Sequence, residues 1–161
     1  MAITHEDRSF LIRAVDLAER ALEHGDEPFG SVLVSVDREI QFEDHNRVSG
    51  GDSTRHPEFE IARWAAANLG VQERRSCVVY TSGEHCPMCS AAHAWVGLGR
   101  IVYASSSEQL GQWLTEWGLE PGPVAALPIG TVAPGIEVDG PEPSLTARIR
   151  DLQRRLRLGE A

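Results

Sequence analysis

Apolar side chains recur along the chain with the periods of helices and strands. From Thr4 to His24 they return every three or four positions, which predicts an amphipathic helix that Gly25 ends. Short β-branched or alternating runs further along are typical of strands, and the turn-like residues 37–39 between the first two runs predict a hairpin. The predicted elements in chain order are a helix over 4–24, strands over 31–36 and 40–43, a helix over 56–69, a strand over 76–81, a helix over 87–96 and a strand over 100–104.

The order of these elements favours an α/β fold. The last two strands are separated by a helix of crossover length, which is how parallel strands are joined. In residues 105–142 a short helical stretch covers about 109–117, and Val132 and residues 136–138 are candidate short strands among many Gly and Pro residues. An amphipathic helix over 144–158 closes the chain. With 161 residues we expect one domain over 1–161.

Composition and charge narrow the function classes. The chain carries 24 acidic and 15 basic residues, a net charge of −9, whereas nucleic-acid-binding proteins normally show a basic excess. No apolar run approaches the roughly 20 residues of a membrane span, and the N-terminus lacks the pattern of a signal peptide. We therefore expect a cytoplasmic protein without a membrane or nucleic-acid partner. The arginines of the last predicted helix form a local basic patch, which is either a solvated face or a site for an anionic ligand.

Two short segments combine residues that carry chemistry. They are His56-Pro57-Glu58 and His85-Cys86-Pro87-Met88-Cys89, and each opens a predicted helix with a proline at the first helical position, where proline is favoured. His56 and Cys86 then take N-cap positions, and Glu58 and Cys89 lie in the first turns. At a helix start, residues two or three apart can converge on one atom. These positions also favour thiolates, because the helix N-terminus carries partial positive charge.

One imidazole and two thiolates form a set of ligands that zinc accepts, and a catalytic zinc keeps its fourth position for water. Glu58 would be a carboxylate beside that water, whose pKa zinc lowers to about 7. The Cys86-x-x-Cys89 motif alone is also typical of a structural zinc knuckle or a redox pair. His93 follows Cys89 by four residues, so it faces the same side of the helix and could complete a structural site. Cys77 lies in an apolar strand and is expected to be a buried thiol.

Together the H-x-E and C-x-x-C motifs resemble those of the cytidine deaminase-like zinc deaminases, and most closely the branch of guanine deaminases and tRNA adenosine deaminases. The resemblance covers roughly residues 8–104. It implies a three-layer α/β/α fold with a five-stranded mixed sheet flanked by helices, one Zn²⁺ per chain, and a homodimer. The zinc ligands would be His56, Cys86 and Cys89, and Glu58 would be catalytic. Further matching residues are Pro28, Phe29, Gly30, Asp52, Thr54, Tyr80, Thr81, Ser82, Glu84, Tyr103 and Ala104.

The resemblance also implies a substrate contact. Asn46, in the loop after the predicted hairpin, would contact the base, so the functional motifs span 46–89. The sequence departs from the family where His85 replaces a proline and where Gly83 stands at a position that is often Cys in the nearest relatives. The last third of the chain, which usually selects the base, has no clear counterpart. The remaining candidates for substrate binding are Phe29, Glu84, His85, Trp113, Glu116 and Trp117.

We therefore expect a zinc-dependent hydrolytic deaminase, a hydrolase of C–N bonds in cyclic amidines. Its substrate would be a small aminated heterocycle: a guanine-like or cytosine-like base or nucleoside, or a related azapyrimidine or triazine. Two alternatives stay open. One is deamination of adenosine in tRNA, and the other is a non-catalytic module with a structural zinc.

Overall fold

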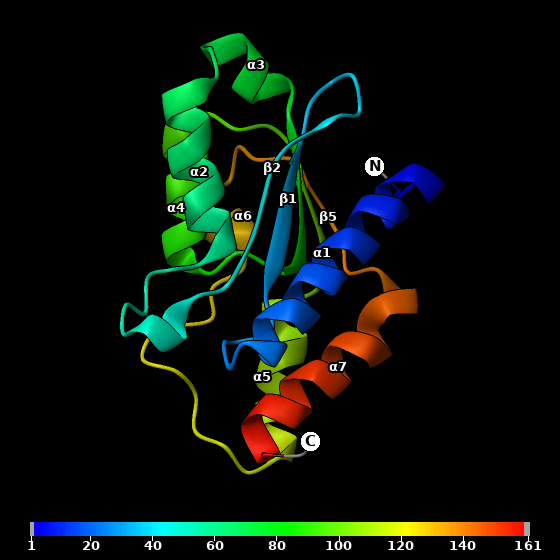
Figure 1. Ribbon diagram of the computed structural model, residues 1–161, viewed down its shortest axis with the longest axis vertical. Coiled ribbons are helices and arrows are strands. Elements are labelled where there is room, and N and C mark those ends of the chain that lie inside the picture. The colour runs from blue at the N-terminus through cyan, green and yellow to red at the C-terminus, as the bar shows by residue number, and fades with distance from the viewer. Residues whose placement is uncertain (1, 160–161) are drawn as a thin grey trace.

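The computed structural model describes residues 2–159 and is built around a five-stranded mixed sheet of order β2-β1-β3-β4-β5 (Figure 1). β1 is antiparallel to both of its neighbours, whereas β3, β4 and β5 run parallel. The sequence prediction of an α/β fold with a mixed sheet is confirmed. The strands are β1 (Gly30–Val34), β2 (Ile40–His45), β3 (Val78–Gly83), β4 (Ile101–Ser105) and β5 (Val138–Asp139).

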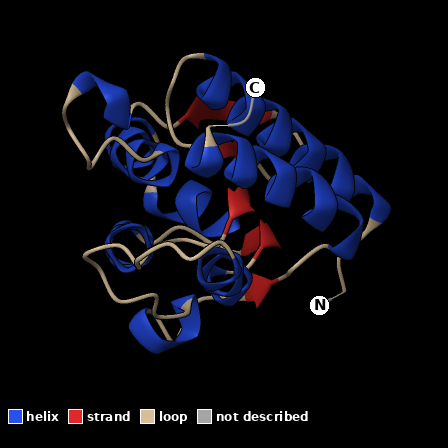
Figure 2. Cartoon of the chain, turned by 90° about the horizontal axis from the view of Figure 1, so that it is seen from below, coloured by secondary structure: helices blue, strands red, loops and turns tan. Residues whose placement is uncertain are grey.

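Helices cover both faces of the sheet, as the view along the strands in Figure 2 shows. Helices α1 (His5–Glu23) and α7 (Pro143–Leu158) pack on one face, and α2 (Pro57–Asn68) and α4 (Pro87–Val96) pack on the other. The remaining helical elements are η1 (Val48–Gly50), α3 (Val71–Ser76), α5 (Ser107–Glu116) and α6 (Ile129–Val132). None of the described helices is both long and apolar enough to cross a membrane.

The alternation of side chains along each strand explains the two apolar layers. Val32 and Val34 of β1 contribute to the cluster under α1 and α7, whereas Leu33 points to the cluster under α2 and α4. Both faces of β1 are thus buried, which accounts for its run of apolar residues. Helix α4 connects the parallel strands β3 and β4. The start of α4 therefore follows the carboxyl end of β3, and the site lies at this end of the parallel strands.

The predicted boundaries hold closely for the long helices, and they differ elsewhere. The strand predicted over 76–81 lies two residues later, because Ser76 ends α3 and β3 runs from Val78 to Gly83. The first strand ends at Val34 because residues 35–39 form the hairpin turn, and β2 continues to His45. The prediction for Val132 is wrong, because this residue ends α6 rather than forming a strand. β5 contains only Val138 and Asp139, so it shares one residue with the strand predicted at 136–138. Helix α3 had no signal in the apolar pattern, since none of its residues is buried.

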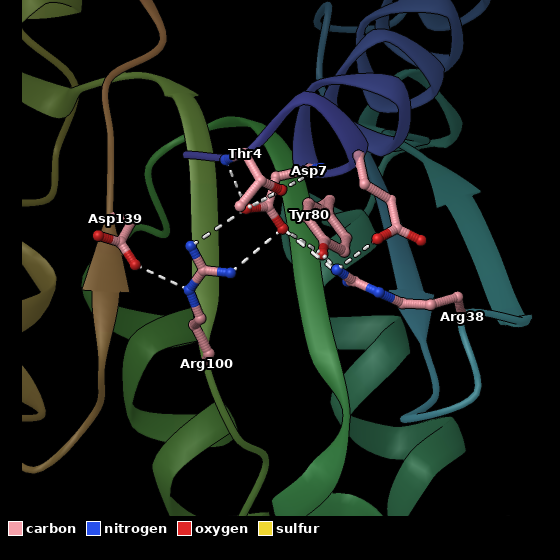
Figure 3. Close-up of polar contacts among 7 residues, drawn as sticks. Thr4, Asp7, Arg38, Tyr80, Arg100 and Asp139 are labelled. Atoms are coloured by element: carbon pink, nitrogen blue, oxygen red, sulfur yellow. Dashed lines mark hydrogen bonds and ion pairs between the residues drawn. The ribbon is translucent and has the colours of Figure 1, made fainter. Parts of the chain in front are cut away.

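A buried polar network fastens the start of α1 to the sheet (Figure 3). Asp7, fully buried, accepts hydrogen bonds from Thr4, Tyr80 and Arg100. Arg100 also donates to Asp139 at 2.7 Å, and Arg38 of the hairpin turn donates to the Tyr80 hydroxyl at 2.9 Å. The network thereby connects α1, the hairpin, β3, β4 and β5.

Candidate metal centre and active site

The metal-ligand candidates occupy the N-cap positions and first turns of α2 and α4. His56 and Cys86 are the N-cap residues, with extended backbone angles of φ −86°, ψ 139° and φ −66°, ψ 168°, and a proline follows each one. Proline excludes its predecessor from the helical region, so both side chains leave the helix and turn toward the same space. Cys89 completes the group from the first turn of α4.

Three ligand atoms meet at this point. The Nδ1 atom of His56 lies 3.6 Å from Cys86 Sγ and 3.7 Å from Cys89 Sγ, and all three atoms lie within 4.8 Å of one another. Zinc–nitrogen and zinc–sulfur bonds of ordinary length place a nitrogen and a sulfur about 3.6 Å apart in a tetrahedron. The arrangement therefore fits zinc, with one tetrahedral position left for water.

The electrostatics of the cysteine pair favour metal binding. A hydrogen bond from Cys89 stabilises the Cys86 thiolate against the cost of burial, and His56 adds to this, so the pKa of Cys86 falls to about 4. The same interaction raises the pKa of Cys89 in the absence of a cation. Metal ligands must be deprotonated, so a bound cation would draw the second thiol into the thiolate form.

Glu58 lies at the edge of this group and is buried in the first turn of α2. Its Oε2 atom is 3.8 Å from Cys89 Sγ, and its Oε1 atom accepts hydrogen bonds from Ser31 and Thr81. Burial raises the pKa of Glu58, although the charge of His56 and the two hydroxyl groups oppose the shift. A raised pKa brings a carboxyl group closer to the pH range in which it can both accept and release a proton.

A cavity of about 540 Å³ opens onto the group. Its wall includes the side chains of His56, Glu58 and Cys86, together with three of the predicted substrate-binding residues, Phe29, Glu84 and Trp113. Sequence reasoning missed Glu27, Gln153 and Arg157, which also line this cavity. Gln153 is buried on the inward face of α7. In the sequence it is a polar residue among Ile149, Leu152 and Leu156, and this pattern could have indicated a buried polar role.

Glu84 supports the cavity wall rather than lying free in it. Its carboxylate accepts hydrogen bonds from the backbone amides of Ser107 at 2.9 Å and Ile129 at 3.0 Å. These amides begin α5 and α6, so one side chain tethers the starts of both helices. Gly83 precedes it, and a Cβ there would lie 2.9 Å from the Phe29 ring, so glycine leaves room for Phe29 at the cavity.

Four other predicted contacts lie outside the cavity lining. Asn46 is buried, its Oδ1 accepts from the Val48 amide, and its Nδ2 has no hydrogen-bond partner among residues 2–159. Glu116 is exposed and forms an ion pair with Arg150, whose guanidinium group lies 6.0 Å from the Trp117 ring. His85 is fully buried with its ring 5.3 Å from that of His93.

His93 is held away from the metal-ligand group. Its Nε2 lies 2.8 Å from the carbonyl oxygen of Gly99, which can only accept, so the ring donates a proton there. Burial lowers the pKa of His93 to about 4. The geometric group of three ligand atoms found among the described residues does not include it. This arrangement does not support the alternative of a structural site completed by His93.

Comparison with known proteins agrees with this geometry. Residues 4–105 match the model of the cytidine and deoxycytidylate deaminase zinc-binding region. Over 104 residues the chain is 36% identical to the guanine deaminase of Bacillus subtilis, covering 64% of this chain and 65% of that protein. Over 111 residues it is 33% identical to a probable cytosine deaminase of Schizosaccharomyces pombe, covering 67% and 65%. The alignments thus span about two thirds of these relatives' length.

The fold agrees as well. The guanine deaminase structure from Nitrosomonas europaea superposes with a TM-score of 0.70 at 23% identity, covering 97% of this chain and 85% of that one. At this identity the likeness concerns the fold. The family match covers more than half of the chain and includes His56, Glu58, Cys86 and Cys89. The chain therefore belongs to the family defined by the cytidine and deoxycytidylate deaminase zinc-binding region, whose deaminase members hydrolyse C–N bonds.

Proposed function

We propose that this protein is a hydrolytic deaminase of a small aminated heterocycle, a free nucleobase or nucleoside with an amidine carbon in its ring. The observation that carries the proposal is the position of Glu58. Its carboxylate is buried beside a three-ligand zinc site and lines the same cavity as two of the ligands. A structural zinc module would have no use for a buried carboxylate there, which must be desolvated at a cost.

His56, Cys86 and Cys89 would hold the zinc, which when bound supplies a Lewis acid that makes hydroxide available near neutral pH. Glu58 accepts a proton from water and delivers it to the ring nitrogen next to the amino-bearing carbon. The water oxygen forms a bond to that carbon. A second proton transfer then turns the amino group into ammonia, and the C–N bond breaks to leave a carbonyl group on the ring. Such acid–base transfer contributes about 10²–10⁴-fold to the rate.

The size of the cavity supports a small substrate. A volume of about 540 Å³ lies within the range of ordinary small-molecule pockets. Phe29 and Trp113 in its wall offer aromatic surface for a flat ring. We propose that Asn46 contacts the ring, since its buried Nδ2 donor lacks a protein partner. The related enzymes named above act on guanine and cytosine, so rings of these two types come first in a substrate search.

Charge weighs against RNA as the substrate. The chain has a net charge of −9, and several arginines of α7 pair with carboxylates, among them Arg148 with Asp16 and Glu19, and Arg157 with Glu27. A patch neutralised in this way adds little attraction for phosphates. We propose a homodimer, as the family resemblance implies, and a place in the cytoplasm, as the sequence pattern of the N-terminus suggests.

The proposal is tested by ammonia release from a panel of purine and pyrimidine bases, their nucleosides, and aminotriazines. The protein is assayed with one zinc per chain and after removal of zinc by a chelator. We expect release with at least one ring and its loss without metal. A silent panel together with deamination of adenosine in tRNA, weakened steeply by salt, would replace the proposal with the RNA alternative. If neither the panel nor tRNA is deaminated by the zinc-bound protein, a structural zinc site is favoured.

A further inference from the structure

Two buried hydroxyl groups lie within hydrogen-bond distance of one oxygen of Glu58. Ser31 at the start of β1 and Thr81 in β3 are directly paired across the antiparallel strands, and both are fully buried. Ser31 Oγ lies 2.9 Å and Thr81 Oγ1 lies 2.8 Å from Glu58 Oε1. The two hydroxyl oxygens are also 2.8 Å apart, so the three oxygens form a closed triangle.

The number of protons decides how this triangle is bonded. Each hydroxyl carries one proton, so two hydrogen bonds serve three contacts. Thr81 has another acceptor in the Gly83 carbonyl oxygen at 3.0 Å, but a carboxylate oxygen is the stronger acceptor. When this group is ionised, Glu58 Oε1 therefore takes at least one of the two protons, and the 2.8 Å contact between the hydroxyls can carry the other. That oxygen is then tied to the sheet.

The other oxygen of Glu58 faces the metal-ligand group. Oε2 lies 3.8 Å from Cys89 Sγ, and among the hydrogen bonds of residues 2–159 it has no hydroxyl donor. The two oxygens of one carboxylate thus have different surroundings, one tied to β1 and β3 and one turned toward the site. This asymmetry needs the hydroxyl groups of both strands.

We propose that Ser31 and Thr81 are positioning residues, which hold Glu58 by Oε1 so that Oε2 is the atom that exchanges protons with water and substrate. The inference rests on the proposed function, because it names the working atom of the proposed proton carrier. Proton transfer falls off steeply with misplacement, and a catalytic group must be held within about 0.5 Å of its working geometry. Without the two hydroxyls, the Glu58 carboxylate keeps its contact with Cys89 Sγ and the hydrogen bond from its own backbone amide, but nothing ties it to β1 or β3.

The test compares Ser31→Ala and Thr81→Val, which remove one hydroxyl each, with the conservative Thr81→Ser. For each protein we measure kcat and KM on the best substrate, zinc content and the unfolding midpoint. We expect kcat to fall about tenfold in Ser31→Ala and in Thr81→Val, the loss expected for one hydrogen bond to a charged group. KM and zinc content stay near the wild-type values. Thr81→Ser restores most of the kcat because it keeps the hydroxyl.

Ser82→Ala is the matched control. Ser82 lies next to Thr81 in the same strand, is equally buried, and uses its hydroxyl to accept from the Gly30 amide at 3.1 Å rather than to contact Glu58. Its loss costs stability and leaves kcat unchanged. A fall of kcat in Ser82→Ala as large as in Thr81→Val would mean that the effect is structural and would overturn the proposal.

A crystal structure of the Ser31→Ala/Thr81→Val double variant gives a readout that does not depend on turnover. We expect the Glu58 carboxylate to rotate or to occupy two positions, against one position in the wild-type protein. An unmoved carboxylate, or an unchanged kcat, would contradict the proposal. If the wild-type protein deaminates nothing, the proposed function fails, while this structural comparison still decides whether the hydroxyls hold Glu58.

Discussion

His56 and Cys86 occupy equivalent places, each immediately before a proline that begins a helix. The proline forces an extended backbone on the residue before it, and the side chain therefore points away from the helix it precedes. This local rule explains why the ligand set could be predicted from the sequence. His56 and Cys86 are each placed by a helix start. The two starts meet because α2 follows β2 and α4 follows β3, and both of these strands are antiparallel to β1 and so end on the same side of the sheet.

Cysteine substitutions test the ligand set at the residue scale. We expect Cys86→Ser to bring bound zinc well below one per chain after dialysis, because a serine hydroxyl is a poor replacement for a thiolate ligand. Metal content by atomic absorption gives the answer. The control is Cys77→Ser, which changes a buried thiol outside the group of ligand atoms. Equal zinc loss in both variants would mean that the thiols act through stability.

The contacts of Glu58 could not be predicted from the sequence. Ser31 and Thr81 are 50 residues apart, and a hydroxyl residue in a strand gives no sign of its partner. Their meeting depends on the register of β1 against β3, which pairs these two residues directly. The inward position of Gln153 depends similarly on how α7 docks.

At the scale of elements, helices and strands were predicted correctly where an apolar pattern was bounded by residues that start or end such an element. Helix α1 begins after a capping box made by Thr4 and Asp7, and its apolar stripe covers the sheet. At the start of α3 the Glu73 carboxylate accepts a hydrogen bond from the Gly70 amide, but this helix has no buried face. Val132 belongs to a single turn whose Ile129 packs on Ile101, a contact that no local pattern reveals.

Gly30 shows how closely α1 approaches β1. A Cβ at this position would lie 2.4 Å from the Ala14 carbonyl oxygen and 2.5 Å from Leu17 Cβ, so the helix would have to move. We expect Gly30→Ala to lower the free energy of unfolding by about 1–3 kcal/mol. Urea denaturation checks this. Gly111→Ala, in the interior of α5 with nothing within 4 Å of the added Cβ, should instead add about 0.5–1 kcal/mol.

At the scale of the whole molecule, the Asp7 network and the metal centre lie at opposite ends of the parallel strands. Arg100 immediately precedes β4 and Asp139 lies in β5, whereas the metal-ligand group and Glu84 follow the carboxyl end of β3. The network therefore anchors the amino ends of the parallel strands, and the chemistry lies beyond their carboxyl ends. Ligand sites in open α/β sheets commonly take this second position.

The network predicts how stability depends on pH. Burial alone would raise the pKa of Asp7, but hydrogen bonds from Thr4, Tyr80 and Arg100 outweigh it and lower the pKa to about 2. A depressed pKa stabilises the fold above the unfolded value near 3.8, and the gain, about 2 kcal/mol, disappears as pH falls toward 2. We expect the stability difference between wild type and Asp7→Asn to shrink over this range.

Urea unfolding at pH 7, 4 and 2.5 measures that difference. The control is Asp37→Asn, which removes a carboxylate from the exposed hairpin turn. A stability difference for Asp7→Asn that stays constant between pH 4 and 2.5 would contradict the assigned network. So would an equal dependence on pH in the control variant.

The central claim is that Glu58 carries protons beside a zinc site, and a matched pair of variants tests it most directly. Ammonia release and zinc content are measured together for Glu58→Gln and for Glu60→Gln, which changes a carboxylate of the same helix turn that pairs with Arg55. We predict that Glu58→Gln lowers kcat by about 10²–10⁴-fold with one zinc per chain retained, while Glu60→Gln stays active. Full activity in Glu58→Gln would contradict the account.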